Sequence, residues 1–317
     1  VLARDLKTGS KVALHGQVVV DASGFSAIIR KKLPPEIGVD TEVDKKDVEL
    51  CYREIRELKE QVADTEFCEI YLSQTVAPGG YCWIFPKGEK NVNVGIGVTM
   101  REGFPNPKNQ LYNHVLSRPL FNGSKIVSSG TWYDPARRPI DCMTGNGVVI
   151  VGDAACQVNP IHGGGIGPSM MGGALAGKTI IEAMERGDVS RKGLWQYNPR
   201  YMKSYGAKQA GLDVFRLLLQ KLGDEGDENI DYVMKYKVVT QEDVLKTSMG
   251  EDLRLNITET TRRVFRGLRK LSLLRELRHA ASVLKRVKVL YRNYPTSPKD
   301  FDDWRRKTRD LIKEAGG

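Results

Sequence analysis

The sequence predicts an α/β protein that carries an inserted antiparallel β-sheet and ends in a helical region. Three features support this fold class. A short apolar run at residues 148–151 is followed by a glycine-rich turn and then by a helical pattern, which is typical of a β-strand connected to an α-helix. Segments of alternating polar and apolar residues occupy much of residues 36–139, and helical periodicity dominates after residue 188. The chain, of 317 residues, is long enough for about two or three packed units.

These patterns divide the chain into four regions: residues 1–35, 36–139, 140–187 and 188–317. The first region is predicted to hold a hairpin over residues 1–23 with its turn at residues 7–10 (KTGS). A small-residue turn at residues 21–26 (DASGFS) and a short helix at 27–33 follow, and Pro34 and Pro35 end that helix.

The second region is predicted to be the antiparallel sheet, because turns such as PGG and KGEKN separate its alternating segments. The expected strands are residues 48–55, 67–72, 81–85 and 92–98, with one helix near residues 109–118. The third region should hold a buried strand at 148–151, a glycine-rich loop and a helix from about residue 168 to 185. The last region is predicted to be helical, with its clearest turn at residues 223–227.

Composition limits where the protein works and what it binds. Hydrophobic residues make up 40% and charged residues 28%, an ordinary globular balance, and no apolar run approaches the roughly 18 residues of a membrane span. The N-terminus lacks the apolar segment of a targeting peptide. The five cysteines form no CxxC pair and the four histidines show no ligand spacing. We therefore expect reduced thiols in the cytoplasm and no metal site.

The glycine-rich turn is the most informative segment. The run VVIVGDAACQVNPIHGGGIG places Asp153 directly after a buried strand, and glycines precede a helix that begins near Pro168. Glycines let a flat ligand approach the backbone, while the free N–H groups and the dipole of a helix N-terminus favour negative charge. The pattern predicts a binding site for a planar ligand that carries partial negative charge.

This run resembles the second flavin-binding motif of glutathione-reductase-type flavoproteins, which include aromatic hydroxylases and geranylgeranyl reductases. The resemblance implies FAD as cofactor, with Asp153 bonded to a ribityl hydroxyl and the helix N-terminus at 164–167 facing the flavin's pyrimidine edge. The implied cofactor-binding residues are Asp153, Ala154, Pro160, Gly163, Gly164, Gly165, Ile166 and Gly167. Cys156 stands where family members often carry glycine, and we assign it to packing rather than catalysis.

An aromatic motif precedes this turn in the chain. Residues 78–86 read PGGYCWIFP, so Tyr81, Trp83 and Phe85 should project from one face of a strand. The motif is similar to the PxxYxWxFP pattern of geranylgeranyl reductases. That resemblance implies a substrate pocket lined by Tyr81, Trp83, Phe85 and Pro86, whereas the same stripe on an ordinary sheet would only be core.

A third family feature is present in weaker form. Asp21, Ser23 and Arg30 resemble a turn that contacts the dinucleotide, although Arg30 is also compatible with a helix surface. No GxGxxG follows a strand anywhere, while the family binds the FAD pyrophosphate with one. We therefore expect an N-terminal FAD-binding segment upstream of residue 1. Residues 1–35 and 140–187 would then be two parts of one FAD-binding domain, and residues 36–139 the substrate domain.

The net charge of +10 is concentrated in residues 262–292, which hold eleven Lys or Arg residues and one acid, Glu276. Apolar residues recur there every three or four positions, which predicts amphipathic helices with a basic side. Such a helix either packs on the body with its charges in solvent or docks peripherally on an anionic lipid surface. Without a recognised motif beside the charge, we expect no nucleic-acid binding.

Together the motifs predict an FAD-dependent reductase that saturates double bonds of geranylgeranyl chains in archaeal-type ether lipids. Its electron donor, ferredoxin or a nicotinamide, is left open, and no catalytic residue is assigned. The alternative is an FAD-dependent monooxygenase or halogenase on the same scaffold, families that lack the aromatic motif. A basic adaptor without enzymatic activity would be favoured by a protein that contains no flavin.

Overall fold

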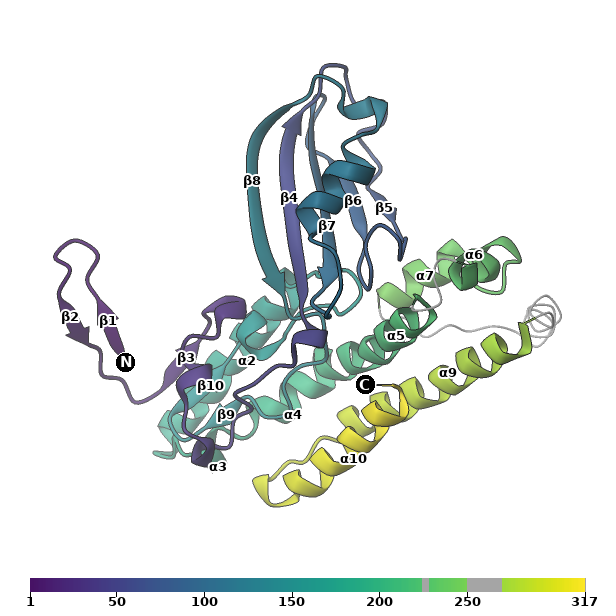
Figure 1. Cartoon of the computed structure of the whole chain (residues 1–317). Coiled ribbons are helices and arrows are strands. Elements are labelled where there is room, and N and C mark those ends of the chain that lie inside the picture. The colour runs from purple at the N-terminus through teal and green to yellow at the C-terminus, as the bar shows by residue number, and fades with distance from the viewer. Residues whose placement is uncertain (224–227, 250–269, 317) are drawn as a thin grey trace.

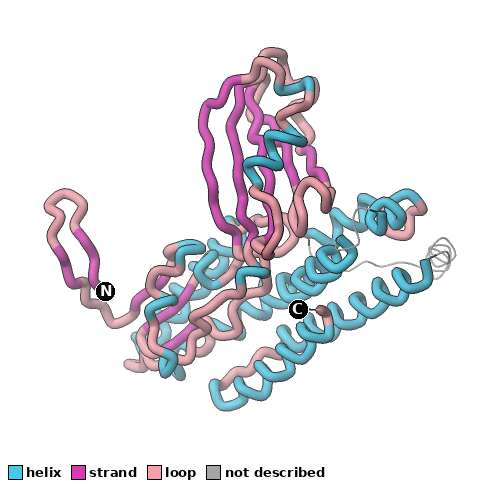
Figure 2. Tube along the Cα trace, in the orientation of Figure 1, coloured by secondary structure: helices cyan, strands magenta, loops and turns pink. Residues whose placement is uncertain are grey.

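The structure is a computed structural model that describes residues 1–223, 228–249 and 270–316. Figure 1 shows a tall antiparallel sheet standing on a layer of helices, with a smaller sheet beside them and an N-terminal hairpin that projects outward. Figure 2 shows that the strands of the tall sheet and the helices below it form separate layers. The predicted α/β fold class is confirmed.

The tall sheet has the strand order β5-β6-β7-β4-β8 and is antiparallel throughout. Its strands are β4 (Glu49–Glu57), β5 (Glu69–Tyr71), β6 (Cys82–Pro86), β7 (Asn91–Thr99) and β8 (Lys125–Asp134). The first four lie where the alternation predicts them. Strand β8 was not predicted, because it is an exposed edge strand whose residues lack the apolar alternation of a half-buried one.

The two faces of this sheet differ. On one face, buried aliphatic and aromatic side chains pack beneath a short helical segment. This segment is α1 (Pro107–Gln110), capped by Asn106 and continued by a single π turn, Leu111–Val115, so the helix predicted near residues 109–118 is present. The core of this face is made of Tyr52, Ile84, Val92, Val94, Ile96, Val98, Leu111 and Val115. The other face has no such cover and forms the cleft described below.

The small sheet joins segments that are far apart in the sequence. Strand β3 (Val19–Asp21) pairs in parallel with β10 (Val148–Ile150), and β9 (Thr144–Gly145) pairs antiparallel with β10. The predicted hairpin is present as β1 (Leu2–Arg4) and β2 (Lys11–Ala13). However, its second strand ends at Ala13, because the chain then leaves the hairpin and its next strand pairs with β10.

The helix predicted at residues 27–33 is wrong. Only 3-10 turns form there, and Ala27 has a positive φ of 45°. The carboxylate of Asp21 accepts the backbone N–H groups of Ser23 and Arg30, and the Ser23 hydroxyl accepts that of Ile28. These bonds replace those of a helix. Arg30 is 2% exposed, so a helix-surface position for it is also wrong.

The helical layer follows the glycine-rich turn. Its helices are α2 (Ile166–Glu185), α3 (Arg191–Leu194), α4 (Tyr197–Tyr201), α5 (Ala207–Gly223), α6 (Glu228–Lys235), α7 (Gln241–Ser248), α9 (Leu271–Arg292) and α10 (Phe301–Glu314). The predicted helical region is thus confirmed where the structure describes it. Residues 224–227 of the predicted turn and residues 262–269 of the basic segment lie outside the described residues.

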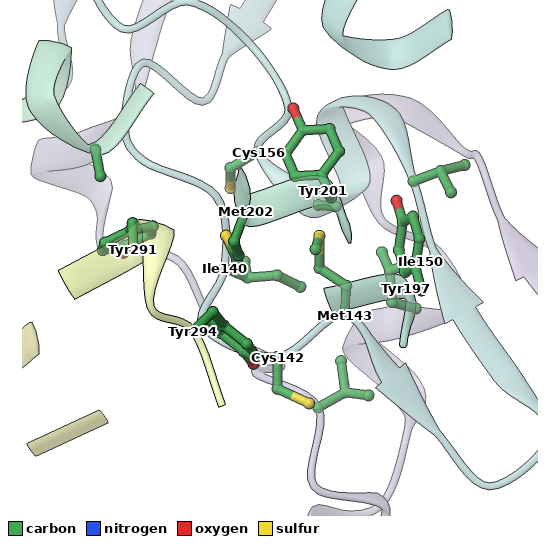
Figure 3. Packing of buried hydrophobic residues seen from close by; sticks show 14 of the residues in the cluster. Ile140, Cys142, Met143, Ile150, Cys156, Tyr197, Tyr201, Met202, Tyr291 and Tyr294 are labelled. Atoms are coloured by element: carbon green, nitrogen blue, oxygen red, sulfur yellow. The ribbon is translucent and has the colours of Figure 1, made fainter. Parts of the chain in front are cut away.

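One core joins the small sheet to the last helices. Figure 3 shows Tyr291 of α9 and Tyr294 just beyond it beside Ile140 and Cys142, which precede the small sheet's strand β9. The Tyr294 hydroxyl donates to the carbonyl oxygen of Asp141 at 2.7 Å. The segment that leads into the small sheet and the last helices therefore share one core. Within the described ranges, no helix has the length and apolar character needed to cross a membrane.

Candidate active site

A cleft of about 580 Å³ lies between the open face of the tall sheet and the glycine-rich turn. This volume is in the range of small-molecule and cofactor sites. The residues that line it come from four strands, the segment before β6, the turn and the start of α2: Glu49, Cys51, Tyr81, Trp83, Phe85, Asn93, Trp132, Tyr133, Asp134, Asp153, Val158, His162, Gly163, Gly165, Ile166 and Ser169.

The predicted aromatic stripe forms one wall of the cleft. The ring centroids of Tyr81 and Trp83 are 5.6 Å apart, and those of Trp83 and Phe85 are 6.3 Å apart. Trp83 lies directly over Gly95 of β7, where a Cβ atom would come within 2.3 Å of its ring. The glycine therefore lets the indole lie against the strand. Pro86 ends β6 and is not among the lining residues.

Tyr81 links the wall to the glycine-rich turn. Its hydroxyl donates to the carbonyl oxygen of His162 at 2.7 Å. Burial raises the pKa of this phenol above its usual value, and the charges of nearby acids raise it further. It therefore stays protonated and keeps its role as a donor. Burial also lowers the pKa of His162, so that its ring is mostly neutral near pH 7.

The first half of the turn is fixed by buried contacts. Gly152 leaves β10 with a φ of 64°, and its N–H donates to the side chain of Gln157 at 2.8 Å. Gln157 in turn donates to the hydroxyl of Tyr197 at 2.7 Å. Cys156 has a positive φ of 55° and is fully buried, which agrees with a packing role and explains why a glycine would be tolerated there.

The second half of the turn leads into the N-terminus of α2. This helix begins at Ile166 with no side-chain cap and no acid in its first turn, so its first N–H groups have no side-chain partner in the described part of the chain. Asp153 lies beside the N-terminus of α2, since a Cβ atom on Gly165 would be 3.1 Å from an oxygen of the Asp153 carboxylate. On Gly163, a Cβ atom would be 2.4 Å from the Asp134 carboxylate.

The geometry brings only part of the predicted set together. Of the residues assigned to the cofactor, Asp153, Gly163, Gly165 and Ile166 line the cleft with the three aromatic residues of the wall. The others do not line it. Ala154 and Pro160 are buried behind the turn, Gly164 bonds through its N–H to His162, and Gly167 faces the hydroxyl of Tyr205.

Acidic residues of the cleft were missed by the sequence analysis. Glu49 and Asp134 face each other directly across β4 and β8, and Cys51 lies two residues further along β4. Burial raises the pKa of Glu49 to about 7. Burial also raises the pKa of Asp134, and the charges of Glu49 and Asp153 raise it further. An acid at the start of a strand predicted to be half-buried was the available signal for Glu49; none existed for Asp134, whose strand was not predicted.

Burial also raises the pKa of Asp153, so this carboxyl is a weaker acid than one in water. Within the described residues, no group of three or more His, Cys, Asp or Glu side chains has the geometry of a metal site. The site is thus an aromatic-walled cleft with buried acids on one side and a glycine-lined helix N-terminus on the other. These features fit a flavin: the glycines leave room for a flat ring, the free N–H groups favour its negative charge, and Asp153 can accept a hydrogen bond from a hydroxyl group.

Comparisons with known proteins agree with this geometry. A family model described as the geranylgeranyl reductase catalytic domain matches residues 47–131. The digeranylgeranylglycerophospholipid reductase of Sulfolobus acidocaldarius is 41% identical over 310 residues, which cover 97% of this chain and 68% of that protein. The chain belongs to the geranylgeranyl reductase family. The protein of the same name from Methanothrix thermoacetophila is 32% identical over 80% of this chain and 62% of its own length.

Solved structures share the fold at lower identity. A geranylgeranyl bacteriochlorophyll reductase-like protein from Thermoplasma acidophilum has a TM-score of 0.63 at 21% identity, covering 86% of this chain and 64% of that chain. A flavin-dependent brominase has a TM-score of 0.53 at 16% identity, covering 85% and 66%. The family resemblance and FAD dependence predicted from the motifs are confirmed. The chain spans about two thirds of the length of these geranylgeranyl reductase relatives.

Proposed function

We propose that this chain forms the substrate-binding and part of the flavin-binding region of a reductase. Its substrate would be the geranylgeranyl chains of an archaeal-type ether lipid precursor such as digeranylgeranylglycerophospholipid. The observation that carries the proposal is the cleft itself, in which the aromatic wall of Trp83 and the flavin-type turn of Asp153 face one space. Family membership supplies the reaction class, a two-electron reduction of carbon–carbon double bonds.

The flavin would be held by the turn. In the glutathione-reductase-type arrangement that we infer, Asp153 accepts a hydrogen bond from the ribityl chain, and the N-terminus of α2 stabilises negative charge on the ring. When bound, reduced FAD supplies the hydride. Residues 1–35 and 140–187 would form the flavin-binding part, and residues 36–139 the substrate domain. The parallel pairing of β3 with β10, which lie on either side of the tall sheet in the sequence, supports this division.

The lipid would lie against the aromatic wall. Tyr81, Trp83 and Phe85 offer a broad apolar surface, and strand β6 places Trp83 opposite Gly95 of β7. An isoprenoid chain has no polar groups to bond, so shape and apolar area are what such a wall recognises. The wall also excludes water from the double bond, which protects the reduced cofactor from side reactions.

Contact with a membrane surface would come from α9. Its apolar side packs on α5 and the core, whereas five of its basic residues are exposed: Arg275, Arg278, Lys285, Arg286 and Arg292. Anionic lipid attracts such a side at about 1 kcal/mol per charge near the surface. Binding of the protein to vesicles of anionic lipid should therefore fall as salt is raised, and it should be absent with neutral lipid.

The lipid assignment is tested with the Trp83→Ala variant. Turnover of a geranylgeranyl lipid should fall while bound flavin is retained, and a short prenyl substrate should be affected less. The measurement is reduction of the two substrates side by side, with flavin absorbance as the check on the cofactor. An equal loss on both substrates would remove the wall from the substrate site, and no reduction of either by the unaltered protein would contradict the proposed function.

A further inference from the structure

Glu49 occupies an unusual position in the cleft. It is the first residue of β4, it is 6% exposed, and it lines the same cavity as Trp83 and Asp153. Among the residues described by the structure, none forms a hydrogen bond or ion pair with its carboxyl group. A Cβ atom on Gly97 of the neighbouring strand would come within 3.0 Å of its Oε2 atom, so the glycine leaves the room that this side chain fills.

Asp134 shares this environment. It stands directly opposite Glu49 across two hydrogen-bonded strands, and its carboxyl also faces the cleft. Two like charges at opposed positions of a sheet repel each other, and each also loses the solvation that water would give it. The pair can avoid both costs by keeping a proton. Burial raises the pKa of Glu49 to about 7, in agreement with this expectation.

A second buried acid, Asp213, lies in a different environment. Asp213 is fully buried but contacts the guanidinium groups of Arg216 at 2.7 Å and Arg138 at 3.1 Å. Burial raises its pKa, but these cations lower it further, so the net shift is downward. The two arginines therefore stabilise the charged form of Asp213. Glu49 has no hydrogen bond or ion pair among the described residues. Burial raises its pKa to about 7 although the charge of Arg216 lowers it, so much of this cleft carboxyl is protonated near pH 7.

We propose that Glu49 is the general acid of alkene reduction, with Asp134 as the opposed carboxyl that keeps the proton on the pair. This role rests on the proposed function. The π bond of the alkene would break as a hydride, which reduced flavin supplies when bound, adds to one carbon and the proton of the Glu49 carboxyl adds to the other. The hydride carries the two electrons of the reduction, and the Glu49 carboxylate would regain a proton from water.

The cleft position also fits the chemistry. An isolated alkene cannot hold negative charge, so protonation of the second carbon must accompany hydride delivery, and a neutral carboxyl inside the apolar cleft can supply it. The ionisable groups that face or influence this acid come from each surrounding element. They are Cys51 on β4, Tyr81 before β6, Asp134 on β8, Asp153 and His162 on the glycine-rich turn, and Arg216 on α5.

The first test is the isosteric variant Glu49→Gln. Its rate of lipid reduction should fall at least about 100-fold, as expected for loss of a general acid. Flavin binding, and reoxidation of the reduced flavin by oxygen, should be unchanged, because neither requires protonation of carbon. The rate of the unaltered protein should decline as pH rises through about 7, and the residual rate of the variant should lack that decline.

A second readout needs no flavin and no substrate. A carboxyl whose pKa is about 7 in the folded protein and near its ordinary value of 4.5 in the unfolded chain makes the folded state less stable as pH rises between these values. Glu49→Gln removes this loss. The difference in melting temperature between the variant and the unaltered protein should therefore increase, in favour of the variant, by roughly 5 °C between pH 5 and pH 8.

The matched control is Glu54→Gln, on the same strand and the opposite face. Glu54 accepts hydrogen bonds from Tyr52 and Tyr112, so its variant should melt lower at every pH and keep the pH dependence of the rate. Lipid reduction in Glu49→Gln at the rate of the unaltered protein would overturn the proposal. So would a melting difference that does not change with pH. Failure of the unaltered protein to reduce the lipid would instead remove the proposed function on which the role depends.

Discussion

The two faces of the tall sheet are built from the same strands but serve different ends. On the packed face, Val92, Val94 and Ile96 are fully buried and form a core with Tyr52 and Leu111. On the cleft face, the residues between them on β7 are glycines and an asparagine, which leave space for aromatic rings and acids. Because side chains alternate along a strand, each strand can supply stability on one side and a binding surface on the other.

The acids of β4 show the same division. Glu54, on the packed face, accepts hydrogen bonds from the hydroxyls of Tyr52 at 2.7 Å and Tyr112 at 2.8 Å and pairs with Arg56. Glu49, on the cleft face, has no such partner among the described residues. Both are buried, so exposure does not distinguish them. Within the part of the chain that the structure describes, the lack of hydrogen-bond and ion-pair partners, rather than burial, therefore distinguishes Glu49 from Glu54.

The largest effect is expected on the packed face. Ile96→Ala removes a fully buried side chain and leaves a cavity, so the free energy of unfolding should fall by about 2–5 kcal/mol. Denaturant unfolding measures this loss. Trp83→Ala is the cleft-face control, and it should cost less despite the larger side chain, because its ring is only partly buried. A larger loss in the control would show that the cleft face is part of the core.

The next effect concerns flavin rather than folding. Asp153→Ala should weaken flavin binding by about 1.5–3 kcal/mol, since it removes a charge-assisted hydrogen bond. Retention of flavin through gel filtration, followed by titration, measures the change. The stability of the flavin-free protein should change little, as Asp153 is only half-buried. Flavin affinity equal to that of the unaltered protein would give Asp153 a structural role only.

A similar effect on stability is expected at the paired acid. Glu54→Gln changes a buried acceptor that serves two tyrosines and an arginine, so unfolding should become easier by about 1–3 kcal/mol. Glu49→Gln should instead be neutral at pH 5 and stabilising at pH 8. Chemical unfolding of both variants at the two pH values makes the comparison. If the two substitutions behaved alike, the distinction between paired and unpaired acids would be lost.

The smallest effect is expected from a single methyl group on the cleft face. Gly97→Ala places a carbon 3.0 Å from the Glu49 carboxyl and 3.2 Å from the Cys51 sulfur. Both are side chains that can move, so the cost in stability should be about 1 kcal/mol. Lipid reduction should fall more than this, because Glu49 is displaced. A variant with normal turnover would place the reacting double bond away from Glu49.

The local patterns of the sequence predicted much of the fold. Four strands of the tall sheet, the hairpin at the N-terminus and helix α2 lie where alternation, turn residues and helix signals put them. Edge strand β8 was missed because an exposed strand carries no apolar alternation. The helix predicted at residues 27–33 failed because Asp21, an acid outside that segment, captures the backbone N–H of Arg30. The Asp21 carboxylate replaces a backbone carbonyl as the acceptor for this N–H group, and it can do so only because strand β3 ends at Asp21.

Two site motifs could be recognised in the sequence: Asp153 with its glycines, and the stripe of Tyr81, Trp83 and Phe85. Each is a continuous run whose local geometry is fixed by a strand or a turn. That the two motifs face one cleft, and that Glu49 and Asp134 meet there, depends on the tertiary fold. These two acids are 85 residues apart by their numbers in the sequence, and they meet only because β4 and β8 pair. The environment of such a pair, and with it the protonation of its carboxyl groups, is a property of packing that no local pattern encodes.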